Sequence, residues 1–504
     1  MTCIALVTAI DPEFRTLREL LDQRTAERSA HGLQLIEGTL AGLRTLLVCT
    51  GMGLDRAGAA IAQVLATFPV DVVINAGIAG GLAADVQPGE LYFCETITRE
   101  ATATKVAVAI RTDDALRAQA SAALSSIQLP HRSGHLVSVG SVVGDPQRKQ
   151  QLVGALGCDL VDMEAHALAA ACQERGVPLL CLKAISDLAD LRLTNLRALF
   201  RLKRNMAHAL QRLQIAVRQI ITASSDQPAA CADVLFRETA DRAGFVRAVI
   251  DRHVDRVRGK RVLVKPNIVS FEGYPTTTHP ATLDAVIAQL KALDCQIVVG
   301  DGPAIDAHPA RVMREHVLCE VCRRHGIQAV NFYATPTERR QASHGSYRLP
   351  RLIKQCDFFI SLPVLKVHSL EKLVLTGALK NQFGLLSKTA RLKFHTAYFA
   401  SSAPIHRCIA EVNSLARPDL FIVDAVDVLV GANELRHGGS TAHLGYLCGG
   451  TDPVALDAFG LSLLQRLDDA RVAGKHPLEI GYLRLAAWEY GLGNPAYRAV
   501  ELSS

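Results

Sequence analysis

The sequence lacks the long hydrophobic runs that mark a membrane-spanning helix. No stretch of 18 or more consecutive apolar residues occurs among its 504 residues, so we expect no transmembrane span. Its first stretch, MTCIALVTAIDPEF, also lacks the basic region and the cleavage site of a signal peptide, and it predicts a first strand instead. We therefore expect a cytoplasmic protein, long enough for two or three domains.

Cysteine pairs at metal-binding spacing are scarce. The 13 cysteines are scattered and odd in number, which fits a reduced protein better than a disulfide framework. The one close pair is Cys319-x-x-Cys322 in VLCEVCRRHG, and no second CxxC occurs. Because a zinc or iron–sulfur site needs about four ligands, we expect two helix cysteines that face a core. We expect no metal and no iron–sulfur cluster.

The sequence also lacks a large excess of charge of one sign, because its net charge of +6 is mild for this length. We therefore expect no nucleic-acid partner. One local excess occurs between Arg192 and Arg218, where seven Lys/Arg and no acid are found. Leu and Ile recur there at helical spacing. The stretch 192–218 is interpreted as a helix with a solvated basic face, or alternatively as a peripheral contact with anionic membrane.

What the sequence does have is an α/β pattern, in two parts. The first part alternates apolar strands with helical stretches, among them Pro12–Gln23, Arg56–Ala66 and Asp162–Arg175. This alternation predicts a mainly parallel sheet covered on both faces. The segment 222-TASSDQPAAC-231 has linker composition, and a second mainly parallel α/β pattern follows it. We expect a first domain over 1–222, a linker over 223–232 and a second domain over 233–504.

Three acids lie at the ends of apolar elements in the first part. Glu13 follows the first strand, Glu164 opens a helix in 159-DLVDMEAHALAAAC-172, and Asp187 follows the strand CLKAIS. Ligands in open α/β sheets sit beyond the carboxyl ends of the strands, although each acid singly could be a helix-start or turn residue. Gly77 and Gly80 in NAGIAGGL would let backbone approach a ligand closely.

The first 190 to 220 residues resemble the nucleoside phosphorylase/nucleosidase superfamily, in particular its 5′-methylthioadenosine/S-adenosylhomocysteine nucleosidase branch. Six segments carry the resemblance in order: ALVTAIDPEF, CTGMGLDRAGAA, VVINAGIAGGL with VQPGEL, VVGDPQRK, LVDMEAHALAAAC and VPLLCLKAISDLAD. The resemblance implies a three-layer α/β/α fold for the first domain. It also implies a homodimer formed through that domain.

The resemblance implies a role for each of the three acids. Glu13 falls where a carboxylate activates the attacking water, and Glu164 falls where a glutamate binds the ribose hydroxyls, with Met163 under the sugar. Asp187, preceded by Ser186, falls where an aspartate protonates purine N7. A carboxylate beside the sugar stabilises an oxocarbenium-like transition state, and an acid at the base stabilises the leaving group. Asp162 is predicted only as a helix cap.

Some positions depart from the family pattern and indicate an altered pocket. Lys183 stands where an arginine is usual, Ile78 replaces a small polar residue, and Ser141 stands where an aromatic residue would stack on the base. Phosphorylases of the superfamily hold phosphate with arginine and Ser/Thr, which NAGIAGG does not supply, so hydrolysis is favoured over phosphorolysis. The remaining substrate-binding candidates are Gly77, Ala79, Gly80 and Val142.

The basic stretch after Asp190 resembles the hopanoid-associated nucleosidases, which act on an adenosylated lipid. The expected function is hydrolysis of the N-glycosidic bond of an adenosine-type nucleoside, such as methylthioadenosine, S-adenosylhomocysteine or an adenosylated lipid. We expect no cofactor in this domain. Two alternatives stay open: a phosphorylase that uses the same site, and a degenerate nucleoside sensor that regulates the second domain.

In the second half, polar residues again follow apolar strands and suit an anionic ligand. Residues 233–465 resemble the uncharacterised family called domain of unknown function 362, through VKPNIV, THPATLDAVI, VVGDGP, SLPVLKVHSL, TGALKNQFGLL, IVDAVDVLVG and GGTDPVALDA. Four members of the set, Asp301, Asp424, His279 and His395, could instead bind a metal ion. The candidate set is Lys265, Asn267, His279, Asp301, Lys366, His368, Lys380, Asn381, His395 and Asp424.

Overall fold

The structure is a computed structural model that describes residues 2–30, 33–100, 109–187, 196–225 and 231–503. The chain divides into two compact units, Met1–Ala229 and Ala230–Ser504. The division falls within 223–232, where we expect the linker, although residues 226–230 of that stretch lie outside the described residues. Within the described ranges, no helix combines the length and the hydrophobicity needed to cross a bilayer.

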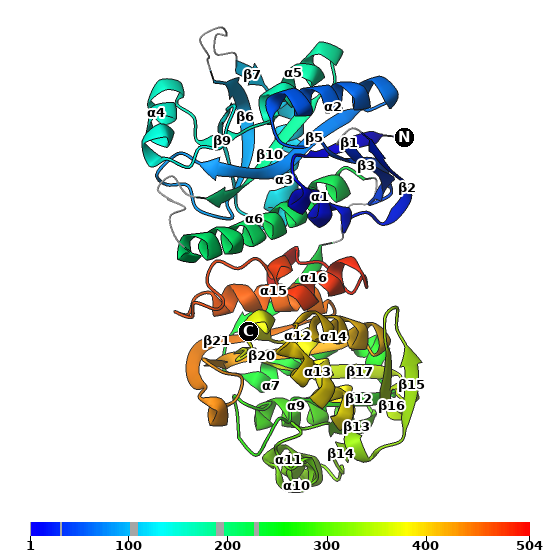
Figure 1. Ribbon diagram of the computed structural model, residues 1–504. Coiled ribbons are helices and arrows are strands. Elements are labelled where there is room, and N and C mark those ends of the chain that lie inside the picture. Colours follow the sequence, from blue (N-terminus) through cyan, green and yellow to red (C-terminus); the bar gives the residue numbers. More distant parts are fainter. Residues whose placement is uncertain (1, 31–32, 101–108, 188–195, 226–230, 504) are drawn as a thin grey trace. The chain divides into compact units, whose positions relative to one another are not determined.

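The first unit is built around one sheet whose centre is parallel (Figure 1). Apolar, β-branched residues form its central strands, which are buried along their length. β5 pairs with β1 on one side and with β10 on the other, and β4 continues the parallel order beyond β1. These strands are β1 (Cys3–Thr8), β4 (Leu43–Cys49), β5 (Val72–Gly81) and β10 (Leu179–Asp187).

The rest of this sheet contains both parallel and antiparallel pairs, so the expected parallel arrangement holds for the centre of the sheet, and the sheet as a whole is mixed. β2 (Gln23–Ala30) and β3 (Leu33–Leu40) add an antiparallel edge to β4, and β6 (Leu91–Arg99) runs antiparallel to β10. The turn before β4 uses Ala41 and Gly42 at positive φ, which suits a tight hairpin. The helix expected over Pro12–Gln23 is shorter, because α1 spans only Asp11–Arg18.

The end of β5 is shared by two neighbouring strands. Its register with β10 places Gly80 opposite Asp187, and Gly80 also pairs with Val161 of β9 (Leu160–Asp162). β8 (His131–Ser138) lies parallel to both β9 and β6. This arrangement gathers the carboxyl ends of β5, β9 and β10, which is where three of the predicted acids are found.

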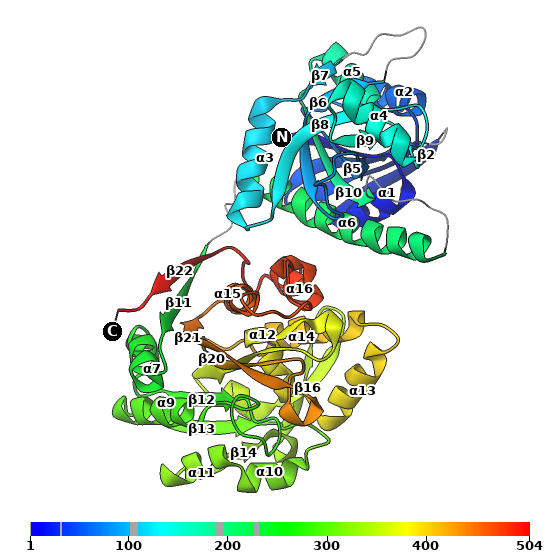
Figure 2. The ribbon, with the colours of Figure 1, turned by 90° about the vertical axis from the view of Figure 1, so that its left-hand side faces the viewer.

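Helices cover both faces of this sheet (Figure 1 and Figure 2). α2 and α5 pack together on one face, and α6 packs with α1 and α3 on the other. The buried side of α6 includes Leu213, Val217 and Ile221. The helices and the remaining short strand are α2 (Leu54–Thr67), α3 (Asp114–Ser126), α4 (Pro146–Leu156), α5 (Ala165–Arg175), α6 (Leu196–Ala223) and β7 (Ala109–Arg111).

The second unit confirms the expected mainly parallel sheet. β14, β13, β12, β17 and β20 lie side by side in parallel, and β21, which is antiparallel to β20, leads to β11 and β22. Short β18 and β19 extend the pairing beside β20, and β15 and β16 form a separate hairpin. The strands are β11 (Ala232–Glu238), β12 (Arg261–Pro266), β13 (Gln296–Asp301), β14 (Val330–Asn331), β15 (Thr337–Gln341), β16 (Ser346–Pro350), β17 (Phe358–Leu362), β18 (Val364–Val367), β19 (Leu375–Thr376), β20 (Leu420–Val430), β21 (Ser440–Gly450) and β22 (Tyr497–Glu501).

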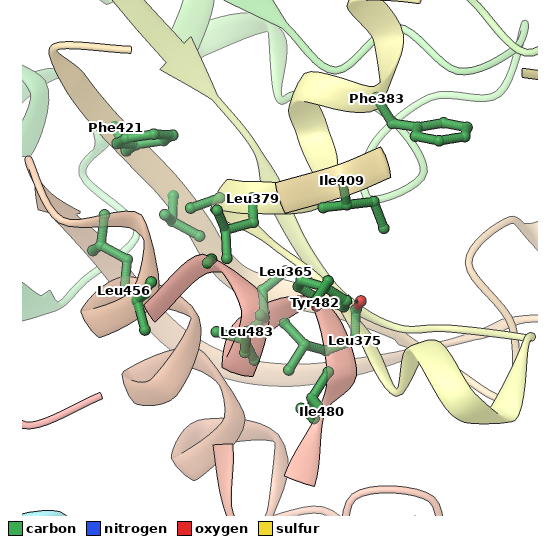
Figure 3. Packing of buried hydrophobic residues seen from close by; sticks show 14 of the residues in the cluster. Leu365, Leu375, Leu379, Phe383, Ile409, Phe421, Leu456, Ile480, Tyr482 and Leu483 are labelled. Atoms are coloured by element: carbon green, nitrogen blue, oxygen red, sulfur yellow. Dashed lines mark hydrogen bonds between the residues drawn. The ribbon is translucent and has the colours of Figure 1, made fainter. Parts of the chain in front are cut away.

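Two hydrophobic cores cover the two faces of this sheet. In one, Tyr482 and Leu483 lie against Leu365 and Leu375 (Figure 3), and the Tyr482 hydroxyl donates to the Leu375 carbonyl at 3.0 Å. The other core contains Cys319 and Cys322 of α11, which confirms the core interpretation of this pair. The helices are α7 (Arg242–Asp251), α8 (Val254–Val257), α9 (Pro280–Ala292), α10 (Pro309–Glu315), α11 (Val317–Arg324), α12 (Ala378–Asn381), α13 (Lys388–Tyr398), α14 (Ala403–Leu415), α15 (Pro453–Leu464) and α16 (Gly481–Trp488).

Candidate functional site

Glu13 is a buried carboxylate held by backbone amides at the ends of β1 and β5. Its Oε2 accepts from the amides of Ala9 at 2.8 Å and Ile10 at 3.2 Å, and its Oε1 accepts from the Ile78 amide at 2.8 Å. Gly77 makes this approach possible, since a Cβ there would lie 2.9 Å from Oε1. Gly77, near the end of β5, therefore leaves room for the Glu13 carboxylate.

Burial raises the pKa of Glu13 above its usual value. The nearby Lys183 ammonium and the three backbone amides act in the opposite direction, because they stabilise the charged form. A raised pKa brings a carboxylate closer to the strength that a general base needs near neutral pH. Glu13 is thus suited both by position and by basicity to take a proton.

Glu164 lies directly before α5 and is also buried. Its Oε1 accepts from the Gly53 amide at 2.8 Å, which ties the start of α5 to the loop that precedes α2. Burial and the adjacent Asp162 raise the pKa of Glu164. Its neighbour Met163 is half-buried and packs against an apolar cluster that includes Val137.

Asp162 does more than the helix capping that the sequence predicts. It accepts from the Ala165 amide at 3.0 Å, as a cap would, and it also pairs with Lys183 Nζ at 2.9 Å with both side chains buried. The Ser138 hydroxyl donates to it at 2.6 Å. Although burial alone would lower the pKa of Lys183, the Asp162 and Glu13 carboxylates raise it. Lys183, predicted to bind substrate, is therefore held as a cation by a carboxylate of its own unit.

Asp187 ends β10 and meets a lysine that the sequence analysis did not single out. Lys149 Nζ of α4 lies 2.7 Å from Asp187 Oδ2, and this lysine is only 1% exposed. The Ser186 hydroxyl lies 3.3 Å from both Asp187 Oδ1 and the Ala79 carbonyl. A Cβ at Gly80 would lie 3.0 Å from Asp187 Oδ1, so the glycine leaves room for the carboxylate. No spacing in DPQRKQQ distinguishes Lys149 from a surface lysine.

The remaining predicted substrate-binding residues divide between the strand end and a loop. Gly77 and Ala79 are buried in β5, while Ile78 is half-buried beside Glu13. Ser141 and Val142 are exposed in the loop between β8 and α4. Among the described residues, no hydrogen bond joins either loop residue to the carboxylates. The structure thus gathers Glu13, Glu164, Asp187 and Lys183 around the ends of β5, β9 and β10, and leaves Ser141 and Val142 outside that network.

The second unit contains a cavity of about 340 Å³ at the carboxyl ends of β12, β13 and β18. Lys265 pairs with Asp301 at 2.7 Å across the ends of β12 and β13. A Cβ at Gly384 would lie 2.5 Å from Asp301 Oδ1, so this glycine allows the close approach. The cavity wall includes eight of the predicted residues: Lys265, Asn267, Asp301, Lys366, His368, Lys380, Asn381 and His395. It also includes Arg391, which the sequence analysis missed.

Asp424 and His279 belong to another cluster. Arg242 donates to Asp424 at 2.7 Å, and the Tyr274 hydroxyl donates to the same carboxylate at 2.7 Å. His279 caps α9 by accepting from the Ala281 amide, and its ring packs edge-on against Tyr274. The structure therefore separates these two from Asp301 and His395, and no three His, Cys, Asp or Glu side chains of the described residues are grouped as metal ligands. The proposed four-residue metal set does not form.

Comparison with known proteins agrees with this two-part organisation. Residues 3–222 match the family model described as Phosphorylase superfamily, and residues 262–462 match the one described as Domain of unknown function (DUF362). A 5′-methylthioadenosine/S-adenosylhomocysteine nucleosidase of Staphylococcus aureus (strain JH9) is 27% identical over 199 residues, which is 37% of this chain and 87% of that protein.

Two solved structures are also similar to part of the chain. A futalosine hydrolase mutant of Helicobacter pylori is 20% identical with a TM-score of 0.41, covering 44% of this chain and 99% of that chain. A 5′-methylthioadenosine/S-adenosylhomocysteine nucleosidase of Neisseria meningitidis, in complex with methylthio-immucillin-A, is 23% identical with a TM-score of 0.41, covering 44% and 100%. The family models agree with both resemblances inferred from the sequence, because residues 3–222 match the Phosphorylase superfamily model and residues 262–462 match the DUF362 model.

Proposed function

We propose that the first unit hydrolyses the N-glycosidic bond of an adenosine-type nucleoside. The observation that carries the proposal is Glu13, a buried carboxylate with a raised pKa that three backbone amides hold at the strand ends, beside Glu164. The match to the phosphorylase superfamily and the relatives named as nucleosidases support the same reaction class.

In this proposal Glu13 takes a proton from the attacking water as the bond to the base breaks. Glu164 holds the ribose hydroxyls, and Met163 lies under the sugar. Asp187 donates a proton to purine N7, so that the base leaves without full negative charge, and the Lys149 ammonium, 2.7 Å from Asp187 Oδ2, supplies the proton that Asp187 passes on. Ser186 and Lys149, which both contact the Asp187 carboxylate, position it.

The candidate substrates are methylthioadenosine, S-adenosylhomocysteine and an adenosylated lipid. The half-buried Ile78, whose amide donates to Glu13, would give the site an apolar side, which favours a substrate with an apolar 5′ group. Ile78 and its neighbours supply no arginine and no Ser/Thr for phosphate, and for this reason we favour water over phosphate as the nucleophile.

Adenine release from these substrates, measured with and without phosphate, tests the proposal. Release that does not depend on phosphate is expected, and Asp187→Asn should lower kcat by about 10²- to 10⁴-fold, the usual contribution of a general acid. Asp85→Asn is the matched control, because Asp85 is exposed and pairs with Arg132. Release only in the presence of phosphate would make the unit a phosphorylase, and no release from any substrate would favour the sensor alternative.

The partners of this unit belong to the same proposal. We propose a homodimer formed through the first unit, and a peripheral contact with anionic membrane through residues 192–218. In the described part of that stretch, exposed Phe200 lies next to exposed Arg201, Lys203 and Arg204 on α6, an apolar side chain among cations as membrane-surface helices have. Residues 192–195 lie outside the described residues. Co-sedimentation with anionic vesicles and the mass in solution test the two parts separately.

A further inference from the structure

The cavity of the second unit carries more positive charge than its carboxylates neutralise. Lys265 pairs with Asp301 at 2.7 Å, and Arg436 pairs with Glu434 at 2.6 Å and with Asp306 at 3.0 Å. Asp301, Asp306 and Glu434 are the carboxylates of the wall, and Arg436 lies outside it. Lys265, Lys366, Lys380 and Arg391 line the cavity, so four cations face three carboxylates, a formal excess of one positive charge with histidine neutral.

Within the described part of the chain, three of these cations contact only neutral groups. Lys366 Nζ donates to the Thr276 carbonyl. Lys380 Nζ lies 4.5 Å from the centre of the Phe383 ring, a cation–π contact. The Arg391 guanidinium donates to the carbonyls of Gly302 and Pro303 and to the Tyr333 hydroxyl. None of the ion pairs among the described residues includes Lys366, Lys380 or Arg391.

Buried ammonium groups without a counter-charge are destabilised. Burial lowers the pKa of Lys366 to about 8. Burial, together with repulsion from Arg391 and Lys366, lowers the pKa of Lys380 to about 7. An anion in the cavity would offset both effects, because opposite charge favours the protonated amine.

Two further polar atoms of the cavity wall have no hydrogen-bond partner among the described residues. They are Thr376 Oγ1 and Arg391 Nε, and both atoms are buried. Since buried polar groups are nearly always satisfied, these two atoms are polar groups of wall residues that lack the usual partner. They belong to β19 and α13, so donors converge on the cavity from different elements.

The helix that carries Lys380 is anchored from outside the cavity. Asp457 of α15 accepts from the amides of Ala378 at 2.5 Å and Leu379 at 3.1 Å, at the start of α12. Lys380 is therefore presented by a fixed element, and a ligand would meet a preformed site.

We propose that this cavity is a binding site for a small organic anion that carries a phosphate or carboxylate group, held by Lys380, Lys366 and Arg391. Arginine and lysine are the usual partners of both groups. The apolar members of the wall, Ile268, Val269, Ile305, Leu370 and Phe383, would contact the organic part. A volume of about 340 Å³ suits a small metabolite. The proposal does not depend on the activity of the first unit.

Calorimetric titration of the full chain with ribose 5-phosphate, inorganic phosphate and citrate tests the proposal, with ribose as the neutral control. Ribose 5-phosphate or citrate should bind and ribose should not; inorganic phosphate shows how much the anionic group contributes alone. Lys380→Met should weaken binding by about tenfold to a hundredfold, the usual loss of a hydrogen bond to a charged group. Lys393→Met is the matched control, because Lys393 is an exposed lysine of α13 outside the cavity wall, and it should bind as the wild type does.

Sulfate binding should also be measured across pH, because the charge of sulfate stays constant over this pH range. Such a pH dependence would not be expected if Lys380 only stabilised the fold. Sulfate should bind more weakly as the pH rises through about 7 to 8, because Lys380 and Lys366 lose their protons there. In Lys380→Met this dependence should shrink. The titratable or charged groups that face Lys380 are Lys366, His368, Arg391, His395, Cys408 and Glu434.

Lys380→Met should fold, because it removes a half-buried charge that has no ion-pair partner among the described residues. Equal binding of the anions by the wild type and by both Lys380→Met and Lys366→Met would overturn the proposal, since the anions would then bind elsewhere. Absence of binding by the wild type to ribose 5-phosphate, inorganic phosphate, citrate and sulfate, all at millimolar concentration, would overturn it as well.

Discussion

Glu13 combines two properties that usually exclude each other, since it is buried and yet surrounded by groups that stabilise its negative charge. Burial disfavours the carboxylate, while the amides of Ala9, Ile10 and Ile78 and the Lys183 ammonium favour it. Without the amides, a carboxyl group at this depth would stay neutral. With them it can ionise at a pH higher than usual, which is what a general base requires.

Replacing Glu13 by glutamine should remove the proton acceptor while keeping the shape of the side chain. We expect kcat/KM for nucleoside hydrolysis to fall by about 10²- to 10⁴-fold, the usual contribution of a general base. In the wild type, kcat/KM should fall as the pH drops through the raised pKa of Glu13, because the protonated acid cannot accept a proton. Steady-state kinetics across pH for both proteins check this.

Glu174→Gln is the control for that experiment, since Glu174 is an exposed residue near the end of α5. It should leave both the rate and its pH dependence unchanged. A Glu13→Gln protein that keeps wild-type kcat/KM would remove Glu13 from the mechanism.

The positions of Glu13, Glu164 and Asp187 could be predicted because each follows or opens an apolar element, and strand ends in α/β sheets meet. The positions of Lys149 and Arg391 could not. Both lie on helices among other charged residues, and only the packing of α4 and α13 shows that they turn inward. When charged residues occur on all faces of a helix, the sequence pattern does not show which face is buried. Tertiary contacts then decide which charged side chains turn inward.

β9 shows how a very short element can organise a site. It has three residues, yet it pairs with β5 and β8 and delivers Asp162 to Lys183 of β10. The sequence analysis assigned Asp162 to a helix, because an acid before an apolar periodic stretch is typical of a helix start. A strand of three residues has too little periodicity to be recognised.

Breaking the buried ion pair between Asp162 and Lys183 should lower the free energy of unfolding more than breaking an exposed ion pair would. Lys183→Met should leave Asp162 buried without its counter-charge and lower the free energy of unfolding of the first unit by about 3 to 5 kcal/mol. Asp162→Asn in the same chain should recover part of that loss, because it removes the unpaired charge. Denaturant unfolding of the single and double variants measures both values.

Lys203→Met serves as the control for the pair, since Lys203 is an exposed lysine of α6. Its free energy of unfolding should stay within about 0.5 kcal/mol of the wild type. If Lys183→Met is as stable as this control, the ion pair does not stabilise the unit.

The strands and helices that the sequence predicted best are those with continuous apolar runs. The second unit is an example, because RVLV, FFIS and FIVD all became central parallel strands. β2 was missed because its sequence, QRTAERSA, is polar and pairs only at the sheet edge. Edge strands need little hydrophobicity, so their sequences resemble loops.

Taken as a whole, the molecule has two units that each possess a complete sheet and their own cores. All the strands of each sheet belong to the same unit. The family models also divide at the same place, with one ending at residue 222 and the other beginning at residue 262. Composition alone predicted the division, because TASSDQPAAC is small and polar between two apolar patterns.

We therefore expect residues 1–225 and 231–504 to fold as separate proteins. Because a domain with its own core does not need its neighbour to bury apolar surface, each fragment should unfold cooperatively. The fragment 1–225 should release adenine with the kcat/KM of the full chain, within about twofold, and 231–504 should bind ribose 5-phosphate as the full chain does. Circular dichroism melts, adenine release and calorimetric titration of the two fragments measure these properties. A fragment that is unfolded alone but folds when mixed with the other would instead mean that the two units share a stabilising interface.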